Sequence, residues 1–548
     1  MVKAQIVRNK NIRFDPLKTE IPVSRKGLKG YLRSSSVRER EIGCIAVANI
    51  KKTHDMKIIK LIVEKISDSC LFVKLAALQA AISLSQEHSD DFLRLGVLNL
   101  IDPILSQHFL ADSKMPSSKQ ERKLIISIVQ NSLYLLESLC QVNLAFFDSF
   151  QDSPIIPRCL EVVLAKNKNY MVPCLELLNT FAEENEQAFE LIEDNFEELY
   201  QLTTYDDLTR DVKMNIILLI SSVCIPSKQK QMIGEYVIFP CWQNLVFNPY
   251  SELVNEVIPS LNKKSKNSYF DAWKSCVKAQ EITLKIITNL LAVENEETPI
   301  GSYFINNSMV NDIVRIASGL LEDVDIGFEA FPDILCSVFE LQCAAFYCLQ
   351  NLIINTDYLI RVVRPKDFWE FLFNQIRKIS CIFQEQTDWK ETAEELLDTI
   401  IKVLLCFSKK YGNLITGKNY YVSELCNLIA HLPGLLPCSL IGTLTICANE
   451  GITSDQARII FNALFLCTVN EDFTTIIEVM NLMYDVFDDE RFDNVLTELR
   501  ILQMMKVGLE MLRIRTSKII DKDLRARGEE AVENSVAFIK YKELHGVN

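Results

Sequence analysis

One stretch of the chain nearly matches the sequence motif of a phosphate-binding loop. The sequence GNLITGKN, residues 412–419, has the G-x4-G-K spacing in which backbone N–H groups and a lysine hold nucleotide phosphates. Asn419 stands where that loop needs a Ser or Thr hydroxyl for Mg²⁺, and the residues before it, TIIKVLLCFSKKY, have helical rather than strand periodicity. We therefore interpret this stretch as a glycine-closed helix end followed by a loop.

Seventeen cysteines and five histidines raise the question of metal or disulfide sites. The cysteines lie in apolar helical segments such as LQCAAFYCLQ, residues 341–350, and no CxxC pair or Cys/His cluster has zinc spacing. We interpret them as buried, reduced thiols, which favours a reducing compartment. No Ser/His/Asp grouping or dinucleotide fingerprint can be assembled either. The sequence therefore predicts a binding protein that is not an enzyme and has no cofactor and no metal.

The charge distribution indicates what is bound. The chain has a net charge of −14, and residues 183–211 contain eleven acids and one arginine. Such a surface repels nucleic acid and attracts basic polypeptides, and helical solenoids bind peptides in their concave groove. A merely solvated outer face is the alternative interpretation. The candidate cargo-binding residues are Glu183, Glu184, Glu186, Glu190, Glu193 and Asp194.

The N-terminal segment has the opposite charge. Residues 1–33 hold nine Lys or Arg and two acids, a net charge of +7, with little periodicity. We expect a flexible arm. Within it, VRNKNIRFDPLK is similar to transportin-type import signals, in which a basic extended segment precedes Pro-Tyr. The candidate signal residues are Arg8, Lys10, Arg13, Pro16 and Leu17, with Leu17 in the place of the usual Tyr.

The elements that carry these residues are predicted to be helices throughout. Gly and Pro are scarce, at sixteen each, and segments such as DMKIIKLIVEKI and ETAEELLDTIIKVLLCF space apolar residues at i, i+3, i+4 and i+7. Residues 425–449 contain no Asp, Glu, Lys or Arg and are long enough to span a membrane. Because they include HLPGLLP, we interpret them as two buried helices joined by a turn.

A phrase that occurs twice indicates how the helices stack. SVREREIGCIAVANI and SDSCLFVKLAALQAAISL place Val37-Arg38 and Val73-Lys74 36 residues apart, each before a group of small residues. Armadillo and HEAT repeats have similar periods, and small residues let neighbouring helices approach closely. Asp68 is expected to cap the second helix, and Arg38 or Lys74 to pair with acids of adjacent repeats.

The expected fold is therefore an all-α, right-handed α-solenoid. We expect the arm at residues 1–33, armadillo-like repeats over 34–245, an inter-half loop at 246–268 and HEAT-like repeats over 269–548.

Several longer phrases resemble the symportin family of armadillo/HEAT adaptors. They are KAQEITLKIITNLLAVENEE (278–297), LQCAAFYCLQNLIINTD (341–357), LIGTLTICANEG (440–451), MNLMYDVFDDERFD (480–493), the tail beginning MLRIRTSKIIDKDLRARGEEAV, and LLNTFAEENEQAFEL (177–191).

The resemblance implies a function and partners. Members of this family bind ribosomal protein uL18 in the solenoid groove, engage uL5 through an acidic insertion, and are imported by transportin. That implies a shuttling adaptor and chaperone, found in cytoplasm and nucleus, for the 5S particle of the large ribosomal subunit. The segment at 248–268 is short and not acidic, which leaves uL5 binding open. A generic armadillo/HEAT scaffold for another protein complex is the alternative. We expect neither membrane nor direct nucleic-acid binding.

Overall fold

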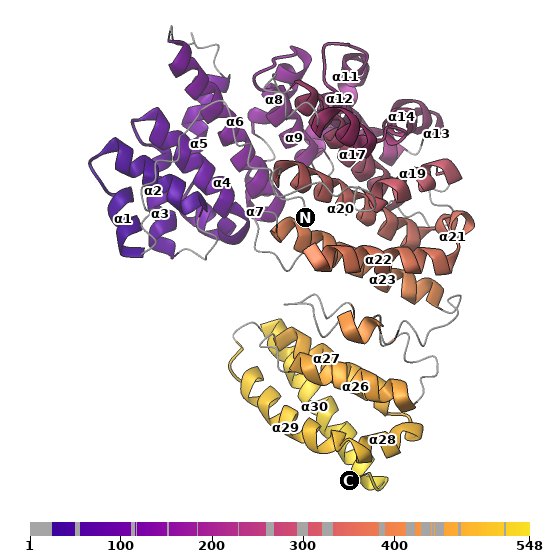
Figure 1. Ribbon diagram of the computed structural model, residues 1–548. Helices are drawn as coiled ribbons and strands as arrows, with labels where there is room; N and C mark the ends of the chain where they lie inside the picture. The colour runs from indigo at the N-terminus through magenta and orange to yellow at the C-terminus, as the bar shows by residue number, and fades with distance from the viewer. Residues whose placement is uncertain are drawn as a thin grey trace. The chain divides into compact units, whose positions relative to one another are not determined.

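The computed structural model confirms the all-α prediction for the part of the chain that it describes. Every secondary-structure element there is a helix (Figure 1). The described residues are 25–49, 55–110, 116, 118–150, 153–182, 185–227, 229–258, 268–292, 305–319, 332–382, 390–412, 422, 424–428, 440, 443, 454–468, 473–519 and 522–547.

The chain divides into two compact units, Met1–Pro240 and Cys241–Asn548. The helices up to this division are α1 (Arg25–Leu32), α2 (Val37–Asn49), α3 (Met56–Ile66), α4 (Leu71–Arg94), α5 (Leu98–Leu105), the π-helical η1 (Ser106–Leu110), α6 (Lys119–Val142), α7 (Leu144–Phe150), α8 (Ile155–Leu164), α9 (Met171–Phe181), α10 (Glu186–Asp194), α11 (Phe196–Thr203), α12 (Arg210–Ser227), α13 (Lys230–Met232), the π-helical η2 (Ile233–Ile238) and α14 (Phe239–Leu245), which contains the division.

The described helices of the second unit follow α14. They are α15 (Pro249–Glu252), the π-helical η3 (Leu253–Val257), α17 (Ser268–Ala292), α19 (Asn307–Ser318), α20 (Pro332–Asn355), α21 (Tyr358–Val362), α22 (Pro365–Ile382), α23 (Lys390–Tyr411), α26 (Ser454–Thr468), α27 (Phe473–Phe487), the short 3-10 helix η7 (Glu490–Phe492), α28 (Asp493–Glu498), α29 (Ile501–Thr516) and α30 (Lys522–Leu544).

A row of stacked central helices runs through each unit. In the first, α2 packs on α4, α4 on α6, α6 on α9 and α9 on α12, with α3, α8, α10 and α11 covering them (Figure 1). In the second, α17 packs on α20 and α20 on α23, while α30 packs on both α27 and α29. Helices that bury their apolar faces against the next helix pair in a row are the defining feature of a solenoid. The predicted solenoid class is confirmed.

The small residues of the repeated phrase lie at contacts between helices. Ala76, Ala77, Ala80 and Ala81 of α4 are all buried, and this helix packs on α2, α3 and α6. In α2, a Cβ atom on Gly43 would lie 3.1 Å from the backbone nitrogen of Leu32. The alanines and this glycine are therefore required by packing on several sides at once.

The charged residues of the phrase are arranged differently from the prediction. Cys70, not Asp68, is the N-cap of α4, although Asp68 accepts a hydrogen bond from the Cys70 N–H at 3.0 Å. Arg40 forms the ion pair with Asp68, at 2.8 and 3.0 Å, while Arg38 is exposed. The expected role of Arg38 was wrong because the neighbouring repeat faces the residue two positions later on α2.

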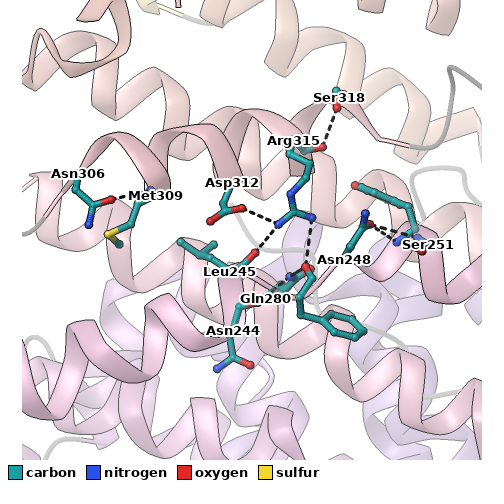
Figure 2. A network of polar contacts seen from close by, with 12 residues as sticks. Asn244, Leu245, Asn248, Ser251, Gln280, Asn306, Met309, Asp312, Arg315 and Ser318 are labelled. Atoms are coloured by element: carbon teal, nitrogen blue, oxygen red, sulfur yellow. Dashed lines mark hydrogen bonds and ion pairs between the residues drawn. The ribbon is translucent and has the colours of Figure 1, made fainter. Parts of the chain in front are cut away.

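The ends of the second unit's helices are capped by side chains from neighbouring helices. Gln280 Nε2 donates to the carbonyl oxygens of Asn244 and Phe247 at 2.9 and 2.7 Å, and Arg315 donates to that of Leu245 at 2.7 Å (Figure 2). The last carbonyls of a helix have no partner within the helix, so these bonds satisfy groups that would otherwise be buried unpaired.

The same arrangement recurs further along this unit. Gln342 donates to the carbonyl of Ala317 at 3.1 Å, and Lys410 donates to those of Ile353 and Thr356 at 2.8 and 2.9 Å. Long polar side chains of one helix thus fix the end of another.

The structure differs from the prediction at two segments, the end of the N-terminal arm and the inter-half loop. Residues 25–32, the end of the expected flexible arm, form α1, which buries Leu28 and Leu32 against α2 and α3. Part of the expected inter-half loop is helical, because α15 and η3 bury apolar side chains such as Leu253 and Val257 in the core of the second unit. The armadillo-like and HEAT-like ranges stay predictions.

Two helices are long and apolar enough to pass a membrane-span test, Lys119–Val142 and Asp333–Asn355. Both are central helices of the stacks, each packed on a neighbour on either side. Most of the segment 425–449 lies outside the described residues. The described cysteines are free thiols, mostly buried as predicted, and burial raises the pKa of Cys44 and Cys140 to about 12.

Candidate cargo-binding surface

Four of the predicted cargo-binding residues lie together on α10. Glu186, Glu190, Glu193 and Asp194 are all exposed on this helix. Glu183 and Glu184 lie outside the described residues, as do the import-signal candidates Arg8, Lys10, Arg13, Pro16 and Leu17.

The local sequence explains why α10 presents its acids to solvent. Asn185 caps the helix by accepting a hydrogen bond from the Ala188 N–H at 2.7 Å. Ala188 and Ile192, four residues apart, are buried, and α10 packs on α8 and α12. The acidic residues follow at i, i+4, i+7 and i+8 from Glu186, so they share the remaining side of the helix.

The negative charge continues onto α11 and the turn that follows. Residues 185–211 hold nine acids and one arginine. The exposed members beyond α10 include Glu197, Glu198, Asp206 and Asp207. Lys168 lies 3.6 Å from Asp207 and partly neutralises one end of this region.

Aromatic side chains adjoin the acids. The ring of Tyr236 in η2 meets those of Phe196 and Tyr200 in α11 edge-to-face, with centroids 5.1 and 4.6 Å apart. Three residues after Tyr236, the Phe239 side chain is 53% exposed. We refer to the exposed acids of α10 and α11 together with Phe196, Tyr200, Tyr236 and Phe239 as the acidic-aromatic surface.

The electrostatics of this surface reflect its concentrated negative charge. The pKa of the Tyr236 hydroxyl is raised above its usual value, first by the negative charge of Glu235, then by burial and by Glu197. On α10, Glu186 and Glu190 are like charges at i, i+4, and Glu193 and Asp194 lie at the negative end of the helix dipole. Each such arrangement costs a few tenths of a kcal/mol, whereas Glu186 in the first turn interacts favourably with the positive end of the dipole. Glu193 and Asp194 are therefore the acids whose positions do not favour the stability of the helix.

The arrangement suits recognition of arginine and lysine side chains. A guanidinium group can bond a carboxylate through two parallel hydrogen bonds, and aromatic faces attract cations within about 6 Å. Carboxylates and rings side by side can therefore hold a basic polypeptide more selectively than carboxylates alone.

The aromatic part of this surface was missed in the sequence. Tyr200 and Tyr236 are 36 residues apart, the same spacing as the repeated phrase. That spacing is the signal that could have placed the two rings together. Phe196 and Phe239 carry no comparable signal.

Metal-ligating side chains do not gather in the described residues. No group of three His, Cys, Asp or Glu side chains is placed there to hold a metal ion. Residues 413–419, which belong to the stretch that nearly matches a phosphate-binding motif, lie outside the described part of the chain.

Solved structures with similar helical stacks include yeast importin-beta and Kap121p. Yeast importin-beta (Kap95p) is 12% identical with a TM-score of 0.41, covering 94% of this chain and 73% of that chain. Kap121p is 12% identical with a TM-score of 0.48, and the match covers 94% of this chain and 57% of that chain. An engineered protein is 13% identical with a TM-score of 0.33, covering 84% and 98%. With TM-scores below 0.5, we base no argument on these likenesses.

The family comparison is more specific. No curated protein matches the sequence. Residues 300–545, a little under half of the chain, match the family model described as "SYO1-like, TPR repeats". This region includes four of the phrases quoted above in full: residues 341–357, 440–451 and 480–493, and the tail phrase that begins at Met511. Over residues 300–545 the chain is therefore similar to the SYO1-like family, which is the symportin family that the sequence resembles.

Proposed function

We propose that the chain is a non-enzymatic adaptor and chaperone that binds ribosomal protein uL18 and supports its nuclear import for assembly of the 5S particle and the large subunit. The observation that carries this proposal is the SYO1-like family match over residues 300–545. The acidic-aromatic surface supports it from the other unit, because a free ribosomal protein is a strongly basic polypeptide.

The proposal extends to transport. A transportin-type receptor would bind the basic segment through Arg13, Pro16 and Leu17, with Arg8 and Lys10 as additional cations. The protein would then shuttle between cytoplasm and nucleus. For uL5, the short, non-acidic segment at 248–268 leaves no acidic insertion to bind it, so uL18 is the first cargo to test.

The acidic-aromatic surface would act at two stages of cargo binding. Clustered carboxylates attract a cationic partner over distances comparable with the screening length, roughly 8 Å at physiological salt, and so raise the association rate. Contacts of arginine side chains with Tyr236 and Phe239 form only after docking and slow dissociation. The carboxylates would then neutralise positive charges of the bound basic protein, as RNA phosphates do.

The test is charge reversal on α10. The variant Glu186→Lys, Glu190→Lys, Glu193→Lys should associate with purified uL18 at least about tenfold more slowly at low salt, because electrostatic steering changes association rates by factors of 10 to 1,000. The difference should shrink as salt rises. Association and dissociation are measured by surface plasmon resonance at several salt concentrations.

A matched control separates this surface from overall charge. Three exposed acids on α3, α4 and α6 give the same change in net charge: Glu64→Lys, Glu87→Lys and Glu121→Lys. The α10 variant should be slowed much more than this control. If both variants associated with uL18 equally slowly, α10 would not be part of the binding site, although the chain would still bind uL18. If the unmodified chain did not bind uL18 at all, the proposed function would be overturned.

A further inference from the structure

Helix α29 is apolar on two opposite sides. One side supplies the core residues Ile501, Leu502, Met505, Leu509 and Leu512, all buried. On the other side, Val507, Met511 and Ile514 are 65%, 50% and 56% exposed.

These three residues form one line along the helix. Their spacing of four and three residues places them on one face, which we call the α29 stripe. A helix that packs on a core needs one apolar side, and its opposite face is normally polar. Packing within the unit therefore does not explain the α29 stripe.

The α29 stripe has cations at both ends. Arg500 is the N-cap of α29 and Lys518 directly follows its C-cap Ser517, so one cation flanks each end of the helix, and both are exposed. Residues 500–518 hold five basic residues and one acid, in a chain whose net charge is −14. Glu510, the one acid, is paired with Arg513 at 2.6 Å.

We propose that the α29 stripe docks an amphipathic helix of another protein whose apolar face is flanked by acidic residues at both ends. Apolar residues at i, i+4 and i+7 are the anchors of helix-in-groove recognition, and exposed apolar lines on soluble proteins mark interaction sites. Glutamate or aspartate at the partner's ends would meet Arg500 and Lys518, which fixes the register.

The charges argue against a second copy of this chain as the occupant. In an antiparallel pair of α29 helices Arg500 would face Lys518, and in a parallel pair each cation would face its own counterpart. Either arrangement places like charges opposite each other, which disfavours the pair.

A lipid surface is also less suited to the α29 stripe. Membrane-bound helices present aromatic and leucine side chains over a broad face bordered by cations. The α29 stripe is one residue wide and has no aromatic residue, and Glu510 lies beside it.

The experiment uses the full chain and two designed peptides. Both are fluorescent helical peptides of about 20 residues with leucines at i, i+4 and i+7, one with glutamate pairs at its ends and one with lysine pairs. Fluorescence anisotropy should show binding of the glutamate peptide only. The variant Val507→Ser, Met511→Ser, Ile514→Ser should weaken that binding by about tenfold or more.

Two further variants isolate the charges and the apolar contacts. Arg500 has a φ of 53°, which glycine adopts without strain, so Arg500→Gly combined with Lys518→Gln removes the end charges without harming the fold. This double variant should bind more weakly and with less salt dependence. Leu144→Ser, at an exposed leucine of α7, should bind as the unmodified chain does.

Three results would overturn the proposal. The first is equal binding of both peptides, or binding of neither. The second is a dimer in sedimentation analysis that the triple serine variant abolishes, since the occupant would then be a second copy. The third is co-flotation with phosphatidylcholine–phosphatidylserine vesicles that the same variant abolishes, since the occupant would then be a lipid surface.

Discussion

Helix–helix contacts of two different kinds can be compared, one in each unit. Between α2 and α4 in the first unit, small buried residues let the helices approach closely, and one ion pair, Arg40–Asp68, links them at the edge. In the second unit, long polar side chains such as Gln280 and Lys410 extend from one helix to the end of another.

This difference determines which substitutions each unit tolerates. A helix–helix contact made by alanines has no space for a larger side chain, but a substitution there leaves few buried polar groups unpaired. A helix–helix contact made by long polar side chains loses several hydrogen bonds when one head group is removed. The carbonyl groups that accepted those bonds then stay buried without a partner, which lowers stability. The following predictions test that distinction, in order of expected effect.

The largest effect is expected at Lys542 of α30. Its side chain is fully buried, and its Nζ donates to the carbonyl of Asp488 at 2.9 Å and to Asp493 Oδ1 at 2.7 Å. Lys542→Met keeps the apolar stem but leaves the carboxylate without its cation, which should lower the free energy of unfolding by about 3 kcal/mol. Urea titration measures the loss.

The control for this variant lies on the same helix. Lys540 is exposed, so Lys540→Met should change stability by no more than about 0.5 kcal/mol. If Lys542→Met changed the free energy of unfolding as little as Lys540→Met, the stability of the second unit would not depend on this buried polar contact.

An intermediate effect is expected from enlarging Ala77 of α4. This residue is 0% exposed, within a helix that packs on α2, α3 and α6. Ala77→Leu should lower the free energy of unfolding by about 2 kcal/mol, because the extra methyl groups force neighbouring helices apart. The exposed Ala145 provides the control, since Ala145→Leu should be nearly neutral. A neutral Ala77→Leu variant would mean that this helix–helix contact is looser than its buried alanines indicate.

The smallest effect is expected at Asp68, and it should depend on pH. Burial alone would raise the pKa of this carboxyl, but the hydrogen bonds and charge of Arg40 and the Cys70 N–H lower it below its usual value. The carboxylate therefore stabilises the fold above an unfolded-state pKa of about 4, and that contribution is lost as pH falls through the lower folded-state pKa.

Asp68→Asn should accordingly be less stable than the unmodified chain by about 1.5 kcal/mol at neutral pH. The difference should shrink below about pH 4. Urea titrations at several pH values measure it, with Asp102→Asn, at an exposed position of α5, as the control. A difference that stays constant down to acidic pH would show that the loss comes from packing rather than from the ion pair.

Helical periodicity and small residues were sufficient to predict the stack from the sequence. The repeated phrases in α2 and α4 pack against each other, and Glu186, Glu190, Glu193 and Asp194 are exposed on one helix. The shared face of the acids depends on spacing along a single helix, and the packing of α2 on α4 follows from the recurrence of one phrase after 36 residues.

Contacts between helices could not be predicted in the same way. That Arg40 rather than Arg38 meets Asp68 depends on how far α2 is rotated about its axis relative to α4. The ring cluster of Phe196, Tyr200 and Tyr236 depends on where η2 meets α11. The sequence of α29 shows apolar residues on both sides, but only the tertiary structure decides that one side is buried and that Val507, Met511 and Ile514 are exposed. The physical reason is that the path of the chain, and not local periodicity, decides which faces meet.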